Sequence, residues 1–249
     1  MRFLILLLLV ASCAPIYTPT TRNVPLFRGA GEFQASAYLT TGVDVQAAYA
    51  LTDHLGVTGS YSILNQKQEL PQNSSFPNTP PSFQRKNNFG EVGLGYYQST
   101  RSLRFELYGG YGVGEGTSYA TYAFFPSFGA RGIIATGKYH RYYIQPSFGT
   151  NNKKFNLLFT MRISGVEFSE FTSDGFIGTT ITKKPTEPLH IFAEPALTGK
   201  FPLVGNLYGV FQLGLNVPVP NEVYFEYTPL QFAVGIQLKA GGSLRSRVY

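Results

Sequence analysis

The feature that most constrains this fold is an alternation of apolar and other residues with a period of two. In the last segment of this kind, the apolar residues share one face: Leu230, Phe232, Val234, Ile236 and Leu238. Successive side chains of a strand point to opposite faces of a sheet, whereas a helix requires a period of about 3.6 residues. The segments that begin at Phe155 and Leu207 repeat the alternation. We therefore expect an all-β chain whose strands each have one apolar and one polar face.

Segments of this kind recur along most of the chain and are each about ten residues long, as in strands that cross an outer membrane. We count about ten of them: 32–40, 43–50, 55–64, 88–98, 103–115, 138–149, 155–168, 189–198, 206–217 and 229–240. No stretch of useful length has helical periodicity. The pattern predicts a single antiparallel up-and-down β-barrel of about ten strands.

The connections between these segments alternate in length after a tight first turn at 41–42. The short ones are 52–54, 99–101, 151–153 and 201–205, and the long ones are 65–87, 116–137, 169–188 and 218–228. Outer-membrane barrels have short periplasmic turns and longer extracellular loops. With an even number of strands, this pattern predicts that both termini are periplasmic.

The first residues predict export. Arg2 precedes an unbroken apolar run of eight residues from Phe3 to Val10, and small residues follow it. This is the pattern of a secretory signal, and the run is too short for a membrane-spanning helix, which needs about 20 residues. Residues 10–13, Val-Ala-Ser-Cys, resemble the lipobox of bacterial lipoproteins. The resemblance implies a signal peptide at 1–12 and acylation of Cys13, with a periplasmic anchor because no acidic residue follows. The alternative is an ordinary signal peptide with a chance cysteine.

Composition agrees with a surface that faces lipid. Charged residues make up 14% of the chain, against about 25% in a typical soluble domain. Without Arg2, the mature chain has 19 basic and 14 acidic residues, a net charge of +5 that is scattered and does not suggest nucleic-acid binding. Cys13 is the only cysteine, so no disulfide can form within the monomer.

Residues 31–240 as a whole resemble small outer-membrane β-barrel proteins, here in a lipidated version. The resemblance is carried by residues 48–55, which look like a periplasmic turn of such barrels, and by the aromatic and glycine-rich last strand. It implies contact with outer-membrane lipid. Residues 13–30, rich in Pro and Thr, are expected to form an extended tether, and the basic tail at 241–249 departs from the family pattern. The alternative is a soluble periplasmic β-barrel or sandwich tethered by lipid.

Five charged residues fall on the expected inner faces of the strands: Glu91, Glu106, Arg141, Arg162 and Glu194. Charges cannot face lipid cheaply, since a Lys or Arg at the midplane costs about 2–4 kcal/mol. A narrow barrel is filled by its own side chains, so we expect a structural network rather than a pore lining. A turn centred between residues 151 and 152 predicts that Arg141 lies opposite Arg162. The next hairpin predicts that Arg162 lies opposite Glu194, with Glu91 across the lumen.

The remaining candidate residues do not indicate chemistry. The three histidines, His54, His140 and His190, share no metal-ligand spacing, and no catalytic, cofactor or metal site is predicted. Alternate glycines from Gly110 to Gly116 are expected to make room for large side chains inside the barrel. Two main function classes remain. One is a structural or surface-interaction barrel, and the other is a small channel or transport accessory. An open water path through the barrel would favour the second class. A lipid-modifying barrel enzyme is a third. The aromatic residues of the 116–137 loop suit either a plug or a binding surface, and no protein or ligand partner can be assigned from them.

Overall fold

The computed structural model describes residues 16–69, 82–123, 130–174, 180–182, 189–219, 223, 225 and 227–241. Within these ranges, no helix is long and apolar enough to cross a membrane. The expected signal peptide, Cys13, the tail after Gly241 and the aromatic residues Phe124 and Phe125 lie outside the described residues.

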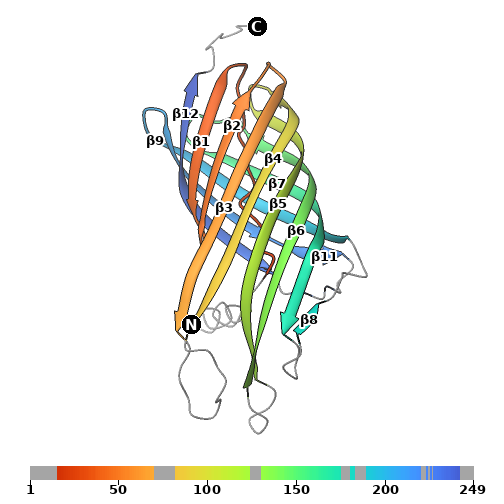
Figure 1. Ribbon diagram of the computed structural model, residues 1–249. Coiled ribbons are helices and arrows are strands. Elements are labelled where there is room, and N and C mark those ends of the chain that lie inside the picture. Colours follow the sequence, from red (N-terminus) through yellow and green to blue (C-terminus); the bar gives the residue numbers. More distant parts are fainter. Residues whose placement is uncertain are drawn as a thin grey trace.

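The described chain is all-β and forms a closed antiparallel barrel of ten long strands, which confirms the predicted fold class (Figure 1). The long strands follow each other around the barrel, and pairing of β7 with β9 closes it. Their bounds are β1 Glu32–Leu39, β2 Val43–Ala50, β3 Leu55–Glu69, β4 Ser82–Ser99, β5 Leu103–Ala123, β6 Ala130–Thr150, β7 Asn156–Asp174, β9 His190–Val204, β10 Leu207–Leu215 and β12 Leu230–Gly241. Two short strands, β8 (Thr180–Thr182) and β11 (Val217–Val219), add to the edges of β7 and β9.

Several strands extend further at the long-loop end than the alternation predicted. Strands β5 and β6 pair without interruption from Leu103 with Thr150 to Ala123 with Ala130. Much of the predicted loop 116–137 is therefore a continuation of this ladder. The sequence did not predict this extension because residues 116–123, Gly-Thr-Ser-Tyr-Ala-Thr-Tyr-Ala, have no strict apolar alternation.

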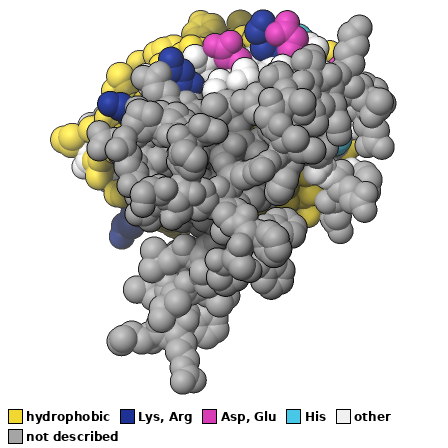
Figure 2. All heavy atoms as spheres, turned by 60° about the horizontal axis from the view of Figure 1, so that its bottom comes forward, with side chains coloured by type: hydrophobic (Ala, Val, Ile, Leu, Met, Phe, Trp, Pro, Cys, Tyr) yellow, Lys and Arg dark blue, Asp and Glu magenta, His cyan; other side chains and the backbone are white. Residues whose placement is uncertain are grey.

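The outer face of the barrel is apolar. Large hydrophobic side chains are exposed on every long strand, including Val92, Phe148 and Phe232. Exposed charged residues of these strands lie instead near the long-loop end, as with Lys138 and Glu170, which form an exposed ion pair at 2.9 Å. Figure 2 looks toward this end and shows hydrophobic side chains on the wall and charged ones gathered at the rim.

The register differs from prediction at one hairpin. Arg141 lies opposite Val166 and not opposite Arg162, whereas Arg162 does lie opposite Glu194. The reason is the length of the connection: residues 151–155 form the loop, held by side-chain hydrogen bonds between Asn152 and Asn156. This loop is centred further along the chain than the tight turn assumed from the sequence. The shift is an even number of residues, so each side chain keeps its face.

The N-terminal segment lies inside the barrel, where it is visible as the red trace in Figure 1. Residues 16–28 carry no strand or helix, and residues 16–27 are buried except for half-buried Thr18. They were expected to form a tether. They are without regular structure, and they run through the lumen. The two ends of the barrel sheet do meet, since Glu32 pairs with Gly241, but Ile16 lies at the opposite mouth. The described chain therefore begins at one mouth of the barrel, at Ile16, and its last strand ends at the other, at Gly241.

Candidate functional site

The candidate site is the lumen together with the chain segment that occupies it. The path of this luminal segment, residues 16–28, is fixed at both ends. At the long-loop mouth, the Ile16 carbonyl accepts a hydrogen bond from Asn87 Nδ2 at 2.9 Å. At the turn end, the Ala30 amide donates to Asp53 Oδ1 at 3.0 Å, just before β1 begins. The chain thus crosses the barrel once and turns back into its wall.

Polar side chains of the wall bind the backbone of the luminal segment. The Thr21 amide donates to Asp44 at 2.8 Å, and the Arg22 amide donates to Gln212 at 2.7 Å. The carbonyls of the segment accept hydrogen bonds from inward side chains, which include Gln46, Gln145, Gln212 and Gln231. An extended chain away from water must have its backbone groups paired, and here the lumen supplies the partners that a neighbouring strand supplies in a sheet.

A cluster of charges lies at the middle of the lumen. Arg162 Nε donates to Glu194 Oε2 at 2.6 Å, and Arg141 forms a direct ion pair with Glu91. All four side chains come from the wall, from β4, β6, β7 and β9, and all are buried. The luminal segment adds a fifth, Arg22, whose guanidinium lies 3.7 Å from Glu194. Of the five inward charges predicted from the sequence, four lie in this cluster, where Arg22 joins them.

Tyr17 and Thr20 connect the luminal segment to this cluster. The Tyr17 hydroxyl donates to Glu194 at 2.8 Å and accepts from Arg141 at 3.2 Å. The Thr20 hydroxyl accepts from Arg141 at 2.7 Å, and the Thr20 carbonyl accepts from Arg162 at 3.1 Å. Removing the segment would therefore leave both arginines and Glu194 with fewer partners, in a place where an unpaired charge is costly.

Arg22 is held mainly by neutral acceptors. Its Nη1 donates to Gln231 Oε1 at 2.5 Å, and its Nη2 donates to Asn216 Oδ1 at 2.6 Å and to the Leu215 carbonyl at 3.1 Å. Buried guanidinium groups need several acceptors because each carries five N–H donors. The side chain is therefore fixed in the wall by β10 and β12.

Glu106 lies apart from this cluster, nearer the turn end. Its carboxylate accepts a hydrogen bond from the Leu26 amide at 2.5 Å, and Arg104 donates to the Leu26 carbonyl at 2.6 Å. Lys200 donates to the Val24 carbonyl in the same layer. Leu26 has a φ of 57°, which a branched side chain rarely adopts, so these charged partners hold a strained bend of the chain.

Aromatic side chains close the lumen on the long-loop side of the charges. Tyr17 packs against Phe192 at 5.1 Å and edge-on against Tyr139 at 5.5 Å between ring centroids. Alternate glycines of β5 face this layer, as the sequence suggested. A Cβ at Gly112 would overlap the ring of Phe89, and one at Gly114 would lie 2.6 Å from the same ring. These glycines therefore provide room for large side chains within the barrel.

Comparison with known proteins gives a structural likeness and no sequence relative. No protein-family model matches the chain, and no curated protein is similar to it in sequence. Among solved structures, the outer membrane protease OmpT from Escherichia coli matches with a TM-score of 0.55 and 12% identity, covering 89% of this chain and all of OmpT (100%). The chain has the fold of an outer-membrane β-barrel. A KdgM porin also matches, with a TM-score of 0.32 and 10% identity over 83% of this chain and 98% of the porin.

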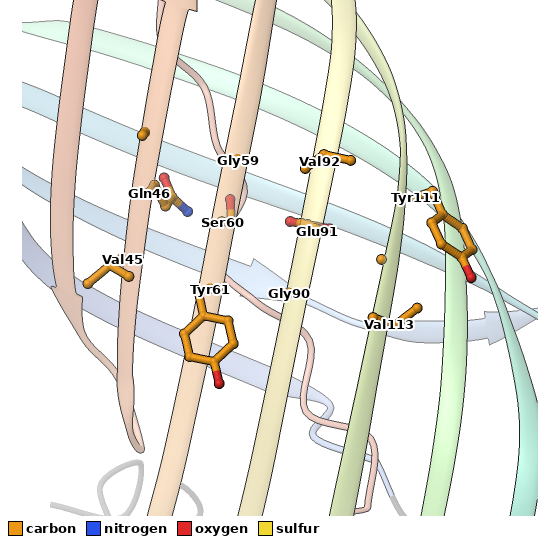
Figure 3. Close-up of a pocket in the computed structure, with 12 residues that line it drawn as sticks. Val45, Gln46, Gly59, Ser60, Tyr61, Gly90, Glu91, Val92, Tyr111 and Val113 are labelled. Atoms are coloured by element: carbon orange, nitrogen blue, oxygen red, sulfur yellow. The ribbon is translucent and has the colours of Figure 1, made fainter.

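The outer wall of this outer-membrane barrel contains two adjoining depressions of about 580 and 730 Å3. Small residues on β2, β3 and β5, among them Ala47, Gly59 and Gly109, form their floors. Figure 3 shows Tyr61 and Tyr111 beside one of them. In a barrel of this kind, the apolar outer surface faces lipid, so these depressions are places for hydrocarbon chains and not part of the lumen.

The histidines do not meet. His54 lies at a short turn and stacks on Tyr96, with ring centroids 5.5 Å apart. His140 contacts the Tyr111 hydroxyl on the outer wall at 2.6 Å. His190 lies against Phe225, with ring centroids 5.1 Å apart. Within the described ranges, no group of His, Cys, Asp or Glu residues is arranged to hold a metal ion.

Sequence reasoning missed Tyr17, Thr20 and Arg22, the residues that the luminal segment contributes. One signal was available. The inner faces of the strands contain several amides beside the charges, for example Gln46, Gln145 and Gln231, and side-chain amides inside a narrow barrel need partners. A composition of this kind indicates that the lumen holds something with free backbone groups. Nothing in the alternation pattern says that the occupant is the chain itself.

Proposed function

We propose that this protein is a plugged outer-membrane β-barrel lipoprotein of structural or surface-interaction type, and neither an open channel nor an enzyme. The observation that supports this most directly is the occupied lumen. A channel needs a continuous water path, but the luminal segment crosses the barrel with its side chains buried from Ile16 to Phe27 except for Thr18. Its backbone is held by side chains from both halves of the wall.

The long-loop end is proposed to face the outside of the cell. Short turns at the periplasmic side and long loops at the extracellular side are the rule for such barrels. Strands β5 and β6 continue past the exposed charged residues Glu115 and Lys138 at that end, as far as Ala123 and Ala130, so they would raise their loop above the membrane. This surface is where a protein or ligand partner would be met.

Lipidation at Cys13 is part of the proposal and is supported by the sequence around it. The cysteine follows a short apolar run and two small residues, as in bacterial lipoproteins. Three acyl chains would give durable attachment, because two lipid signals already suffice. A plugged barrel with such an anchor is suited to presenting its loops rather than to moving solutes.

Ion conductance of the purified protein in planar bilayers tests the closed state. The unmodified protein should add no conductance steps above those of the lipid alone. Deletion of residues 17–27 should produce steps, because an extended chain leaves a passage of about 5 by 10 Å when it is removed.

The double variant Tyr17→Ala/Arg22→Ala keeps the chain length and covers the case in which the deletion does not fold. It should open intermittently, whereas Lys153→Ala/Lys154→Ala, at an exposed turn, should stay closed. Stable conductance by the unmodified protein, equal to that of the deletion, would overturn the proposal.

A further inference from the structure

The direction of the luminal segment decides which mouth the N-terminal end of the chain leaves by. Residue numbers increase from the long-loop mouth, at Ile16, to the turn end, at Ala30. The chain that precedes Ile16 therefore joins the segment at the long-loop mouth. This is the opposite end from the one where β1 begins and β12 ends.

The level of Ile16 along the barrel can be placed from its contacts. Its carbonyl lies against Asn87 and Gly116, which pair with each other. The neighbouring residue Glu115 is exposed and pairs with Lys138, which forms the exposed ion pair with Glu170. These charges mark where the apolar outer wall ends, so Ile16 lies level with the edge of the membrane on that side.

Chain length then limits where Cys13 can be. Two residues, Ala14 and Pro15, lie between it and Ile16, and the three steps along the chain span at most about 11 Å even when fully extended. The apolar band of an outer-membrane barrel is about 25 Å tall, so Cys13 cannot reach the far leaflet while the segment is in the lumen. An anchor in the leaflet at the turn end and an occupied lumen are therefore mutually exclusive in this chain.

We infer that the N-terminal end of the mature chain leaves the barrel at the long-loop mouth, so that lipid on Cys13 enters the leaflet on that side. The inference rests on the proposed function for the lipid itself and for the assignment of that side to the cell surface. Under that assignment, the anchor lies in the outer leaflet. The lipid anchor and the long loops would then lie on the same face of the membrane.

The contacts of the segment make this arrangement durable. The ion pairs and hydrogen bonds of Tyr17, Thr20 and Arg22 lie between Ile16 and the turn end, so they resist withdrawal of the chain in either direction. The bend at Leu26, bound by Glu106 and Arg104, adds a second fixed point. Moving Cys13 to the other leaflet would require all of these contacts to break together.

Single-cysteine labelling on intact cells tests the inference in the full-length protein. Cys13 is the only native cysteine, so an acylated chain has no free thiol and Pro15→Cys introduces a single one. Ser74→Cys, between β3 and β4, marks the long-loop end, and Lys153→Cys marks the turn end. A membrane-impermeant maleimide should label Pro15→Cys to the same extent as Ser74→Cys, and Lys153→Cys only after permeabilisation. Ala14→Cys serves as a second position next to the first.

The outcomes separate the inference from the proposed function. If Pro15→Cys and Ala14→Cys follow Lys153→Cys, the inference is overturned. If Lys153→Cys is labelled on intact cells and Ser74→Cys is not, the proposed orientation fails, while the inference is still decided by which reference Pro15→Cys follows. If the unmodified protein is labelled, Cys13 is not acylated, and that label itself reports the mouth.

Discussion

The Tyr17 hydroxyl donates a hydrogen bond to Glu194 at 2.8 Å, across 177 positions of the sequence. Tyr17 belongs to the luminal segment and Glu194 to β9, so this bond joins the occupant of the barrel to its wall. Arg162, on the neighbouring strand, donates to the other carboxylate oxygen at 2.6 Å. The inner charges and the luminal segment therefore form one network, and a change in either should affect both.

The first prediction concerns Glu194. Glu194→Ala removes the acceptor for Tyr17 and the partner of Arg162, and breaking a buried pair in this way typically lowers the free energy of unfolding by about 3–5 kcal/mol. Urea unfolding of the barrel in detergent, followed by its heat-modifiable shift on gels, measures the loss. Ile191→Ala, on the outer side of the same strand, is the matched control and should have a smaller effect. Equal losses for both variants would contradict the network.

The second prediction concerns the glycines of β5. A Cβ at Gly112 would overlap the Phe89 ring, so Gly112→Ala should destabilise the barrel by about 1–3 kcal/mol through overpacking. Gly109→Ala, on the outer face of the same strand, is the control, because its Cβ would meet nothing closer than a backbone oxygen at 3.7 Å. The unfolding midpoints of the two variants in urea compare them directly. If Gly112→Ala is as stable as Gly109→Ala, the barrel is not packed tightly there.

The third prediction concerns lipidation. Cys13→Ala removes the acylated side chain, so the variant should take up no label from radioactive palmitate and should accumulate unmodified or unprocessed. Ser12→Ala keeps the small residue before the cysteine and should label as the unmodified chain does. Equal incorporation into the Cys13→Ala and unmodified proteins would exclude acylation at this residue.

The fourth prediction concerns the loops. Epitope tags placed within 70–81 or 175–179 should be detected by antibody on intact cells, because these connections lie at the long-loop end. Tags at Asp53 or Asn152, which lie in short turns, should be detected only after permeabilisation. The reverse pattern of detection would invert the proposed orientation of the barrel.

Much of the fold was predictable because strand alternation is a local property. Each side chain of β12 has the face that its neighbours in sequence suggest, with Phe232 outside and Gln231 inside. The same parity argument placed Arg141, Arg162 and Glu194 on the inner face. The predicted cross-strand partner of Arg141 was wrong, because the register of β6 and β7 depends on the geometry of the loop at 151–155 and not on alternation.

The sequence by itself thus determined the class of fold, the face of each strand and the inward position of the charges, since periodicity requires only neighbouring residues. The tertiary structure alone decided what fills the lumen. The Pro19 carbonyl accepts from Gln231, which is 212 positions away, and no local pattern specifies such a contact. The luminal segment has no apolar alternation that would predict a strand. Its path is set instead by backbone groups that must find hydrogen-bond partners inside a closed wall. That path also places Ile16, and with it the direction of the N-terminal chain, at the long-loop mouth.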